Sequence, residues 1–207
     1  AVFTYGGSAI DYIGENKVPG PIVPLVAVPT TAGTGSEVTA VAVIEDESKH
    51  LKLAVASSFV RPALAIVDPL LTLSCPPKAT AESGMDALAH AVESFTVISH
   101  AALDVPADMR LQFTGKNLAA DALAEKAIRL IGAHLRTAVY QPKNVPAREA
   151  MHLAALLAGM AFNSAGLGAV HSLQYPVGAV THTPHGLGTG LLLPYVCRYL
   201  LPAAAGS

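Results

Sequence analysis

The sequence has 207 residues, of which 52% are hydrophobic and 14% charged, and its formal net charge is −2 with histidine neutral. This composition is typical of a well-filled globular protein and excludes an intrinsically disordered chain. The charge offers no basic surface to nucleic acid, and no apolar run reaches the ~20 residues that span a bilayer, so we expect neither nucleic acid nor a membrane as partner. The N-terminal residues do not resemble a signal peptide, and the two cysteines favour reduced thiols, which together predict a cytoplasmic protein.

The first part of the sequence predicts strands. Residues 21–31 are a short apolar run bounded by proline and glycine, and residues 63–69 are a second one that stops at Asp68-Pro69; we expect both to be buried strands. Residues 38–44 and 51–57 flank the polar segment 45–50, which predicts a hairpin.

Beyond residue 75 the apolar residues recur every three to four positions, as in helices. This spacing predicts helices over residues 81–95, 117–140 and 146–166. Asn117 is a suitable N-cap for the second helix, because its side chain can accept a hydrogen bond from the first turn. Gly166 is suited to end the third.

The last part of the sequence, from residue 167 on, predicts further helix with a break marked by proline, and residues 100–116 predict a surface loop. The fold class is therefore α/β followed by all-α. We expect two domains, a strand-rich one over residues 1–75 and a helical one over residues 76–207.

Asp86 and His90 lie four residues apart on a predicted helix, so their side chains share one face. Taken alone, this pair also fits an ordinary surface or capping pair. His171 and His185 each lie in an apolar, glycine-rich setting, where an unpartnered polar group would be costly to bury. Together the four residues offer one oxygen and three nitrogen ligands, a set that suits Fe(II) or Zn(II) better than Mg²⁺ or Ca²⁺.

Two neighbouring residues leave alternatives open. His182 fits a ligand, a proton carrier or an ordinary loop residue. Glu93 follows His90 by three residues, so it can face the same site or support the helix and the ligands from behind. The remaining histidines lie in no motif and fit surface or helix-face positions: His50, His100, His134 and His152.

Residues 28–39 read VPTTAGTGSEVT and directly follow a predicted strand. Two glycines among small hydroxyl residues can bring backbone N–H groups close to a phosphate or a nucleotide. A Gly-x-Gly alone also fits an ordinary tight turn. The pattern therefore allows a nucleotide-binding loop without requiring one.

Four segments occur in an order known from one family. The stretches PTTAGTGSEVT, GMDALAHAVES, HSLQYPVGA and PHGLGTGLLLPYV resemble the iron-containing (group III, metal-dependent) alcohol dehydrogenases, and HSLQYP leans toward the hydroxyacid-oxoacid transhydrogenase branch. The resemblance implies a partial Rossmann-like dinucleotide-binding region followed by a helical metal-binding domain, the dehydroquinate synthase-like fold. Family members extend further at both ends, so we expect this fold to be incomplete here.

The resemblance also implies a reaction, the reversible transfer of a hydride between an alcohol, or a 2-hydroxyacid, and the nicotinamide of NAD(P). Asp86, His90, His171 and His185 match the family's metal ligands, with Fe(II) expected and Zn(II) as the alternative. The expected partners are an alcohol, aldehyde or oxoacid substrate and further copies of the chain in a homo-oligomer.

For the cofactor, the resemblance implies contacts from Thr30, Thr31, Thr34 and Lys52. The expected proton carriers are Tyr175, which replaces a family histidine, and His182. Thr189 replaces a family asparagine. Two other readings stay open: a metal-binding remnant without dehydrogenase activity, and a hydrolase that uses the same metal to activate water.

Overall fold

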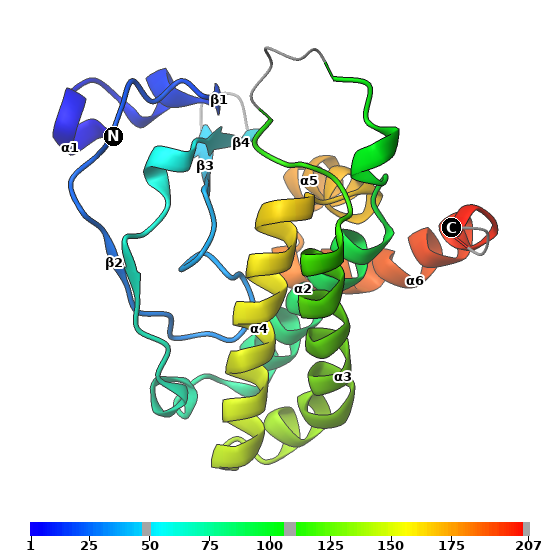
Figure 1. The fold of residues 1–207 in the computed structure, drawn as a ribbon. Coiled ribbons are helices and arrows are strands. Elements are labelled where there is room, and N and C mark those ends of the chain that lie inside the picture. The colour runs from blue at the N-terminus through cyan, green and yellow to red at the C-terminus, as the bar shows by residue number, and fades with distance from the viewer. Residues whose placement is uncertain (47–50, 106–110, 205–207) are drawn as a thin grey trace.

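A computed structural model of the chain describes residues 1–46, 51–105 and 111–204 (Figure 1). The strand-rich segment lies beside a bundle of helices. The elements run in the order α1 (Val2–Tyr5), η1 (Ala9–Tyr12), β1 (Gly14–Glu15), β2 (Val26–Ala27), β3 (Val41–Asp46), β4 (Leu51–Ala56), η2 (Ser58–Val60), β5 (Leu64–Ala65), η3 (Pro69–Thr72), α2 (Pro77–Thr96), η4 (His100–Ala102), α3 (Leu118–Tyr140), α4 (Val145–Ala165), α5 (Ala169–Thr181) and α6 (His185–Ala204).

The predicted hairpin is confirmed. Strands β3 and β4 pair antiparallel with Val43 opposite Ala54, and β1 joins the other edge of β4 in parallel with Gly14 opposite Val55. Part of the predicted turn, residues 47–50, lies outside the described residues. The three strands lie in the order β1-β4-β3, and Lys52, near the start of β4, lies opposite Glu45 of β3.

The prediction of two buried strands over residues 21–31 and 63–69 is wrong in extent and in burial. Only β2 and β5 form within these runs, as a two-stranded parallel sheet in which Val26 lies opposite Leu64. Val26 is 51% exposed and Leu64 53% exposed. A parallel pair is normally covered on both faces by helices. These two exposed side chains therefore meet solvent on at least one face of the sheet.

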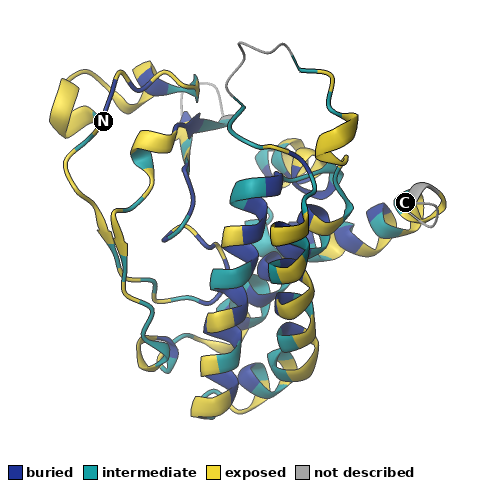
Figure 2. Cartoon of the chain, viewed as in Figure 1, coloured by how far each residue is buried: buried dark blue, intermediate teal, exposed yellow. Residues whose placement is uncertain are grey.

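Helices α2, α3 and α4 pack side by side and form the largest part of the core (Figure 2). Alanines with no exposed surface line the contacts, among them Ala91 on α2, Ala124 on α3 and Ala158 on α4. Because alanine has no side chain beyond Cβ, the helix backbones can approach closely and still exclude water. The result is a rigid support for the residues that α2 carries.

The predicted caps of the long helices are confirmed. Asn117 Oδ1 accepts a hydrogen bond of 3.0 Å from the backbone N–H of Ala120, in the first turn of α3. Helix α4 ends at Gly166, whose φ of 101° suits glycine and few other residues. The turn at Gly166 directs the chain across the end of α4 into α5.

The break predicted near the C-terminus falls between α5 and α6. Helix α5 ends at His182, which has a left-handed φ of 54°, and α6 begins at His185, immediately after Pro184. The other prolines of this region lie inside the two helices. Among the described residues no single helix is long and apolar enough to cross a membrane, and the one pair that passes this test together, α4 and α5, is bent by 102°.

The two glycines of the 28–39 loop pack against the helices. A Cβ added to Gly33 would stand 2.5 Å from Ser83 Cβ on α2, and one added to Gly35 would stand 2.6 Å from Gly159 Cα on α4. The φ of Gly35 is also positive, at 63°. These glycines thus let the loop contact two helices directly, in addition to any role toward a ligand.

A buried arginine fixes the start of the helical part. Arg148 is 2% exposed, and its guanidinium donates to Thr80 Oγ1 at 2.7 Å, to the carbonyl of Cys75 at 3.1 Å and to the carbonyl of Pro142 at 3.0 Å. A buried charge is stable only when its donors are satisfied. Arg148 therefore links the first turn of α4 to the segment that leads into α2.

The predicted loop between α2 and α3 is confirmed over its described residues, apart from the short turn η4; residues 106–110 lie outside them. Its base is pinned to the end of α4, because the N–H of Thr114 donates to the carbonyl of Ser164 at 2.8 Å. Ser99 and Lys116 also form a single bridge. This places Phe113 against Gly166, near the junction of α4 and α5.

Candidate metal centre and cofactor cleft

The four predicted metal ligands converge from three helices. Asp86 and His90 come from α2, His171 from α5, and His185 is the first residue of α6. The Asp86 carboxylate lies 3.8 Å from Nε2 of His90, 3.6 Å from Nε2 of His171 and 3.5 Å from Nε2 of His185. Two ligand atoms bound at ~2.1 Å to one tetrahedral ion would stand about 3.4 Å apart. The observed separations are close to that spacing.

Three of the four residues form the most compact set. Asp86, His171 and His185 each offer a ligand atom, and these atoms lie within 4.8 Å of one another. His90 approaches the second carboxylate oxygen, Oδ2, from the side. Its ring stacks on that of His171 at 4.7 Å and lies 4.4 Å from the ring of Phe162. His90 is thus in place at the edge of the compact set.

Hydrogen bonds orient the rings of His171 and His185 so that Nε2 of each faces Asp86. Nδ1 of His171 donates to Glu93 Oε2, and Nδ1 of His185 donates to Gln174 Oε1 at 2.7 Å. In the neutral, metal-binding form of each ring the proton then lies on Nδ1, and the Nε2 lone pair faces Asp86. Nε2 of His171 is buried and has no hydrogen-bond partner among the described residues. A metal ion would satisfy this atom, so the residues fit a divalent cation with nitrogen and oxygen ligands.

The electrostatics of the cluster favour a cation. Burial alone would raise the pKa of Asp86, but the charges of His90 and the other two histidines outweigh burial and hold that pKa well below its usual range. Burial lowers the pKa of His90 to about 4, against the attraction of Asp86. Burial also lowers the pKa of His171, but the two neighbouring carboxylates, Asp86 and Glu93, outweigh burial and raise that pKa to about 9. The two carboxylates thus favour a positive charge at this point, and a bound metal ion would take the place of the proton on Nε2.

Two further residues support the ligands. Glu93 is 2% exposed, and its Oε1 accepts hydrogen bonds from the N–H of Gly168 at 3.0 Å and of Val170 at 2.7 Å. Of the two roles open to Glu93 in the sequence, the structure favours support of a ligand. Thr189 is fully buried and donates to Asp86 Oδ1 at 3.2 Å. Thr189 thus restrains the carboxylate from the side of α6.

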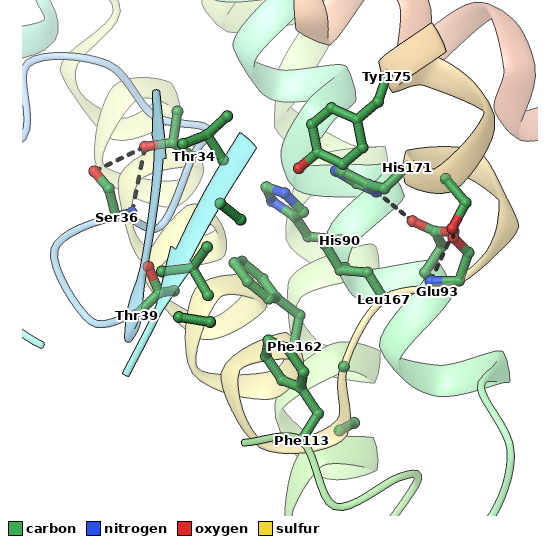
Figure 3. A pocket seen from close by; sticks show the side chains of 18 of the residues that line it. Thr34, Ser36, Thr39, His90, Glu93, Phe113, Phe162, Leu167, His171 and Tyr175 are labelled. Atoms are coloured by element: carbon green, nitrogen blue, oxygen red, sulfur yellow. Dashed lines mark hydrogen bonds and ion pairs between the residues drawn. The ribbon is translucent and has the colours of Figure 1, made fainter. Parts of the chain in front are cut away.

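A cavity of about 1340 Å³ joins these residues to the 28–39 loop. Figure 3 shows Thr34, Ser36 and Thr39 on one side, facing His90 and His171 on the other. Thr34 Oγ1 donates to Ser36 Oγ at 3.1 Å and accepts from the backbone N–H of Ser36 at 3.3 Å. Lys52, from β4, also lines the cavity.

The structure separates the four predicted cofactor residues into two groups. Thr34 and Lys52 line the cavity, whereas Thr30 and Thr31 do not. Sequence reasoning missed Ser36 and Thr39, which do line it. Their signal was available, because both are small hydroxyl residues of the same loop.

The two predicted proton carriers lie in different surroundings. Tyr175 lines the cavity with its ring 5.8 Å from that of His185, and burial, with the charges of Asp86 and Glu93, raises the pKa of its phenol. It therefore keeps its proton at neutral pH. His182 is exposed at the C-cap of α5 and is not part of the cavity lining, so its role as a proton carrier stays a prediction.

The other described histidines, His100, His134 and His152, are not part of the cluster. His100 is exposed and its Nδ1 lies 2.7 Å from the carbonyl oxygen of Thr114. Of the surface and helix-face positions expected for these histidines, His152 takes the second: it is 1% exposed on the face of α4 that packs into the core. His50 lies outside the described residues.

Comparisons with known proteins agree with this arrangement. The family model described as the Fe-containing alcohol dehydrogenase family, C-terminal, matches residues 80–206, and the model of iron-containing alcohol dehydrogenase matches residues 1–69. The chain is 41% identical over 198 residues to the NAD-dependent methanol dehydrogenase of Bacillus methanolicus, covering 96% of this chain and 48% of that protein. It is 38% identical over 204 residues to the mitochondrial hydroxyacid-oxoacid transhydrogenase of Pongo abelii, covering 90% and 44%.

A solved structure from the same family also resembles this chain along most of its length. The crystal structure of 1,3-propanediol oxidoreductase superposes with a TM-score of 0.84 at 41% identity, covering 96% of this chain and 48% of that one. The chain thus spans about half the length of the relatives it matches. The match runs through the loop, the cavity and all four converging ligands, and the chain belongs to the iron-containing alcohol dehydrogenase family.

Proposed function

We propose that this chain carries the metal centre and part of the cofactor cleft of an NAD(P)-linked alcohol dehydrogenase. One observation carries the proposal: a single cavity is lined both by the Asp86 cluster and by the hydroxyl groups of the 28–39 loop. Hydride transfer needs the alcohol carbon and the nicotinamide side by side, so a shared cavity is the arrangement that the reaction requires.

The metal would be held by residues of this chain. Asp86, His90, His171 and His185 would hold the metal, which we expect to be Fe(II), with Zn(II) as the alternative. Such an ion, when bound, acts as a Lewis acid that lowers the pKa of an alcohol or polarises a carbonyl. Such an ion binds unprotonated Nε2 atoms. The hydrogen bonds at Nδ1 of His171 and His185 favour this, because they keep the ring proton on the other nitrogen.

The opposite wall would hold the nucleotide. Thr34 and Lys52 offer a hydroxyl and an ammonium group to the cofactor, and Ser36 and Thr39 extend that polar surface. Tyr175 would donate its proton toward the reacting oxygen, because its raised pKa keeps the phenol neutral.

An apolar wall closes the remaining side of the cavity. Phe113, Phe162 and Leu167 lie together below His90 in Figure 3. They keep water away from the reacting carbon, which protects a hydride from protonation.

The comparisons support the reaction class and leave the substrate open. The relatives named above act on methanol, on 1,3-propanediol and on hydroxyacid-oxoacid pairs, so we propose a small alcohol, aldehyde or 2-oxoacid as substrate. A homo-oligomer and a cytoplasmic location stay predictions. We also keep the proposed division of the chain at residue 75, which the separate family matches to residues 1–69 and 80–206 support.

The test is metal-dependent turnover. Protein is loaded anaerobically with Fe(II), or with Zn(II) in parallel, and nicotinamide absorbance is followed against a panel of alcohols, aldehydes and 2-oxoacids. We expect turnover in the wild type and none in Asp86→Ala, since Asp86 contacts all three histidines. Turnover that survives in Asp86→Ala would contradict the proposal.

The span of about half of its relatives favours one second candidate, a metal-binding remnant. Such a protein would bind Fe(II) tightly and show neither nucleotide affinity nor turnover. Ester hydrolysis that needs the metal but no nucleotide would instead favour the hydrolase reading.

A further inference from the structure

Glu93 joins two helices through one buried carboxylate. It comes from α2, is 2% exposed, and makes three hydrogen bonds, all of them to α5 or to the residue before it. Oε1 accepts from the backbone N–H of Gly168 and Val170, while Oε2 accepts from Nδ1 of His171. The two oxygens of one side chain thus hold the backbone and the side chain of the same helical turn.

The backbone contacts replace a missing cap. The N-cap of α5 is Gly168, which has no side chain to accept from the first turn, and that turn carries no acidic residue. The first N–H groups of a helix need external acceptors, and the partial positive charge at this end favours an anion. The Glu93 carboxylate supplies both the hydrogen-bond acceptor and the negative charge. A Cβ on Gly168 would stand 3.1 Å from Glu93 Oε1, so the absence of a side chain allows the carboxylate to reach the backbone.

The side-chain contact determines how His171 can bind a cation. A carboxylate accepts hydrogen bonds and does not donate, so Nδ1 of His171 must carry the proton. In the neutral ring Nε2 then carries the lone pair, so a metal ion can bind there in place of a second proton; Nε2 faces Asp86, 3.6 Å away, and has no hydrogen-bond partner among the described residues. The negative charge behind the ring also raises the basicity of Nε2.

We infer that Glu93 is a positioning residue of the metal centre, which sets the orientation of His171 and ties it to the first turn of α5. The inference rests on the proposed metal site. Glu93 is not one of the four proposed ligands; it acts through His171, to which its Oε2 is hydrogen-bonded. Metal affinity should therefore depend on the hydrogen bond that Oε2 accepts from His171. It should not depend on the bonds by which Oε1 caps the first turn of α5.

The substitution Glu93→Gln separates these two roles. Glutamine has nearly the same shape and keeps one oxygen that can accept from Gly168 and Val170. Its other end is an NH₂ group, which cannot accept from Nδ1 of His171. We expect the metal-free variant to keep its helical circular dichroism and to unfold cooperatively. We expect its affinity for Co(II) to fall roughly 10- to 100-fold, the usual effect of losing such a partner.

The measurement is a Co(II) titration of the full chain, with affinity taken from competition with a chelator and coordination from the visible absorption bands. Glu125→Gln is the matched control, because Glu125 is exposed on α3 and pairs only with Arg129 in the described structure. This control should bind Co(II) as the wild type does. A Glu93→Gln variant with wild-type affinity and unchanged absorption bands would overturn the inference and leave the proposed function standing.

Two further outcomes are decisive. A wild type that does not bind Co(II) would overturn both the inference and the proposed metal centre. If Glu93→Gln does not fold, nitrogen NMR of the Zn(II)-loaded wild type replaces it. We expect the His171 proton on Nδ1 and the metal on Nε2, and a metal on Nδ1 would overturn the inference.

Discussion

Gly35 and Gly159 lie in backbone contact where the glycine-rich loop meets α4. A Cβ added to Gly159 would stand 2.8 Å from Gly35 Cα and 3.0 Å from a Val38 methyl group. Real Cβ atoms do not approach backbone atoms this closely without a shift of one partner. The position of the loop, and of Thr34 on it, therefore depends on the absence of two side chains.

Gly159→Ala should destabilise the protein. Overpacking of this kind costs about 1–3 kcal/mol, of which the better helix propensity of alanine returns at most about 1 kcal/mol. Gly132→Ala is the control, because Gly132 also lies in a helix and a Cβ there meets nothing within 4 Å. Urea unfolding of the two variants should give shifts of opposite sign. An equal gain in stability in both would show that the loop moves aside without cost.

Thr189→Val should weaken metal binding and leave the fold intact. Valine has the shape of threonine but cannot donate to Asp86 Oδ1, which Thr189 does at 3.2 Å from a fully buried position. Loss of such a contact lowers metal affinity roughly tenfold or more. Chelator competition with Co(II) measures the change. Unchanged affinity would mean that Asp86 is held by its histidines alone.

Thr34→Val should weaken nucleotide binding without changing the metal content. Thr34 lines the cavity opposite the metal ligands, and valine removes its hydroxyl while keeping its size. Metal content and NAD(H) affinity are measured on the same samples, the second by fluorescence titration. Equal NAD(H) affinity in both proteins would show that the loop serves only to contact the helices.

His152 should make the metal-free protein less stable in acid. Burial lowers its pKa, more than the nearby Asp68 raises it, so the folded value lies below the unfolded value of about 6.5. Above pH 6.5 both states are neutral and the group contributes nothing. As the pH falls below 6.5, the unfolded chain binds the proton first, so stability is lost by up to about 1.4 kcal/mol per pH unit until the folded pKa is reached.

His152→Leu removes this group and should flatten the dependence. The free energy of unfolding of the variant, minus that of the wild type, should rise between pH 7.5 and pH 5.5. The change of this difference with pH is the readout, because the substitution also removes the interaction of His152 with Asp68. A difference that does not change with pH would contradict a buried neutral imidazole.

The long helices were predictable because their signals are local. The spacing of apolar residues, the Asn117 cap and the stop at Gly166 each involve residues within a few positions of one another. Burial of β2 and β5 was not predictable in the same way. An apolar run predicts a covered strand only if other elements cover it, and the sequence of the run does not contain that information.

The members of the candidate metal site could be proposed from the sequence, but their geometry could not. The spacing of Asp86 and His90 gives one shared face of α2, but their distance to His171 and His185 depends on how α5 and α6 pack. The link from Glu93 to His171 spans 78 residues, and no local pattern reports it. The glycines of the 28–39 loop fit two explanations, close approach to a ligand or close approach to another part of the chain. The structure shows the second, because Gly33 contacts α2 and Gly35 contacts α4.

The central claim is that one cation site is built by Asp86 with the three histidines. The most direct test is the Fe(II) content of wild type and Asp86→Ala, loaded anaerobically and passed through a desalting column side by side. We expect an iron content of about one Fe(II) per chain in the wild type and almost none in Asp86→Ala, because three neutral imidazoles without the carboxylate hold Fe(II) weakly. Equal iron content in the two proteins would contradict it.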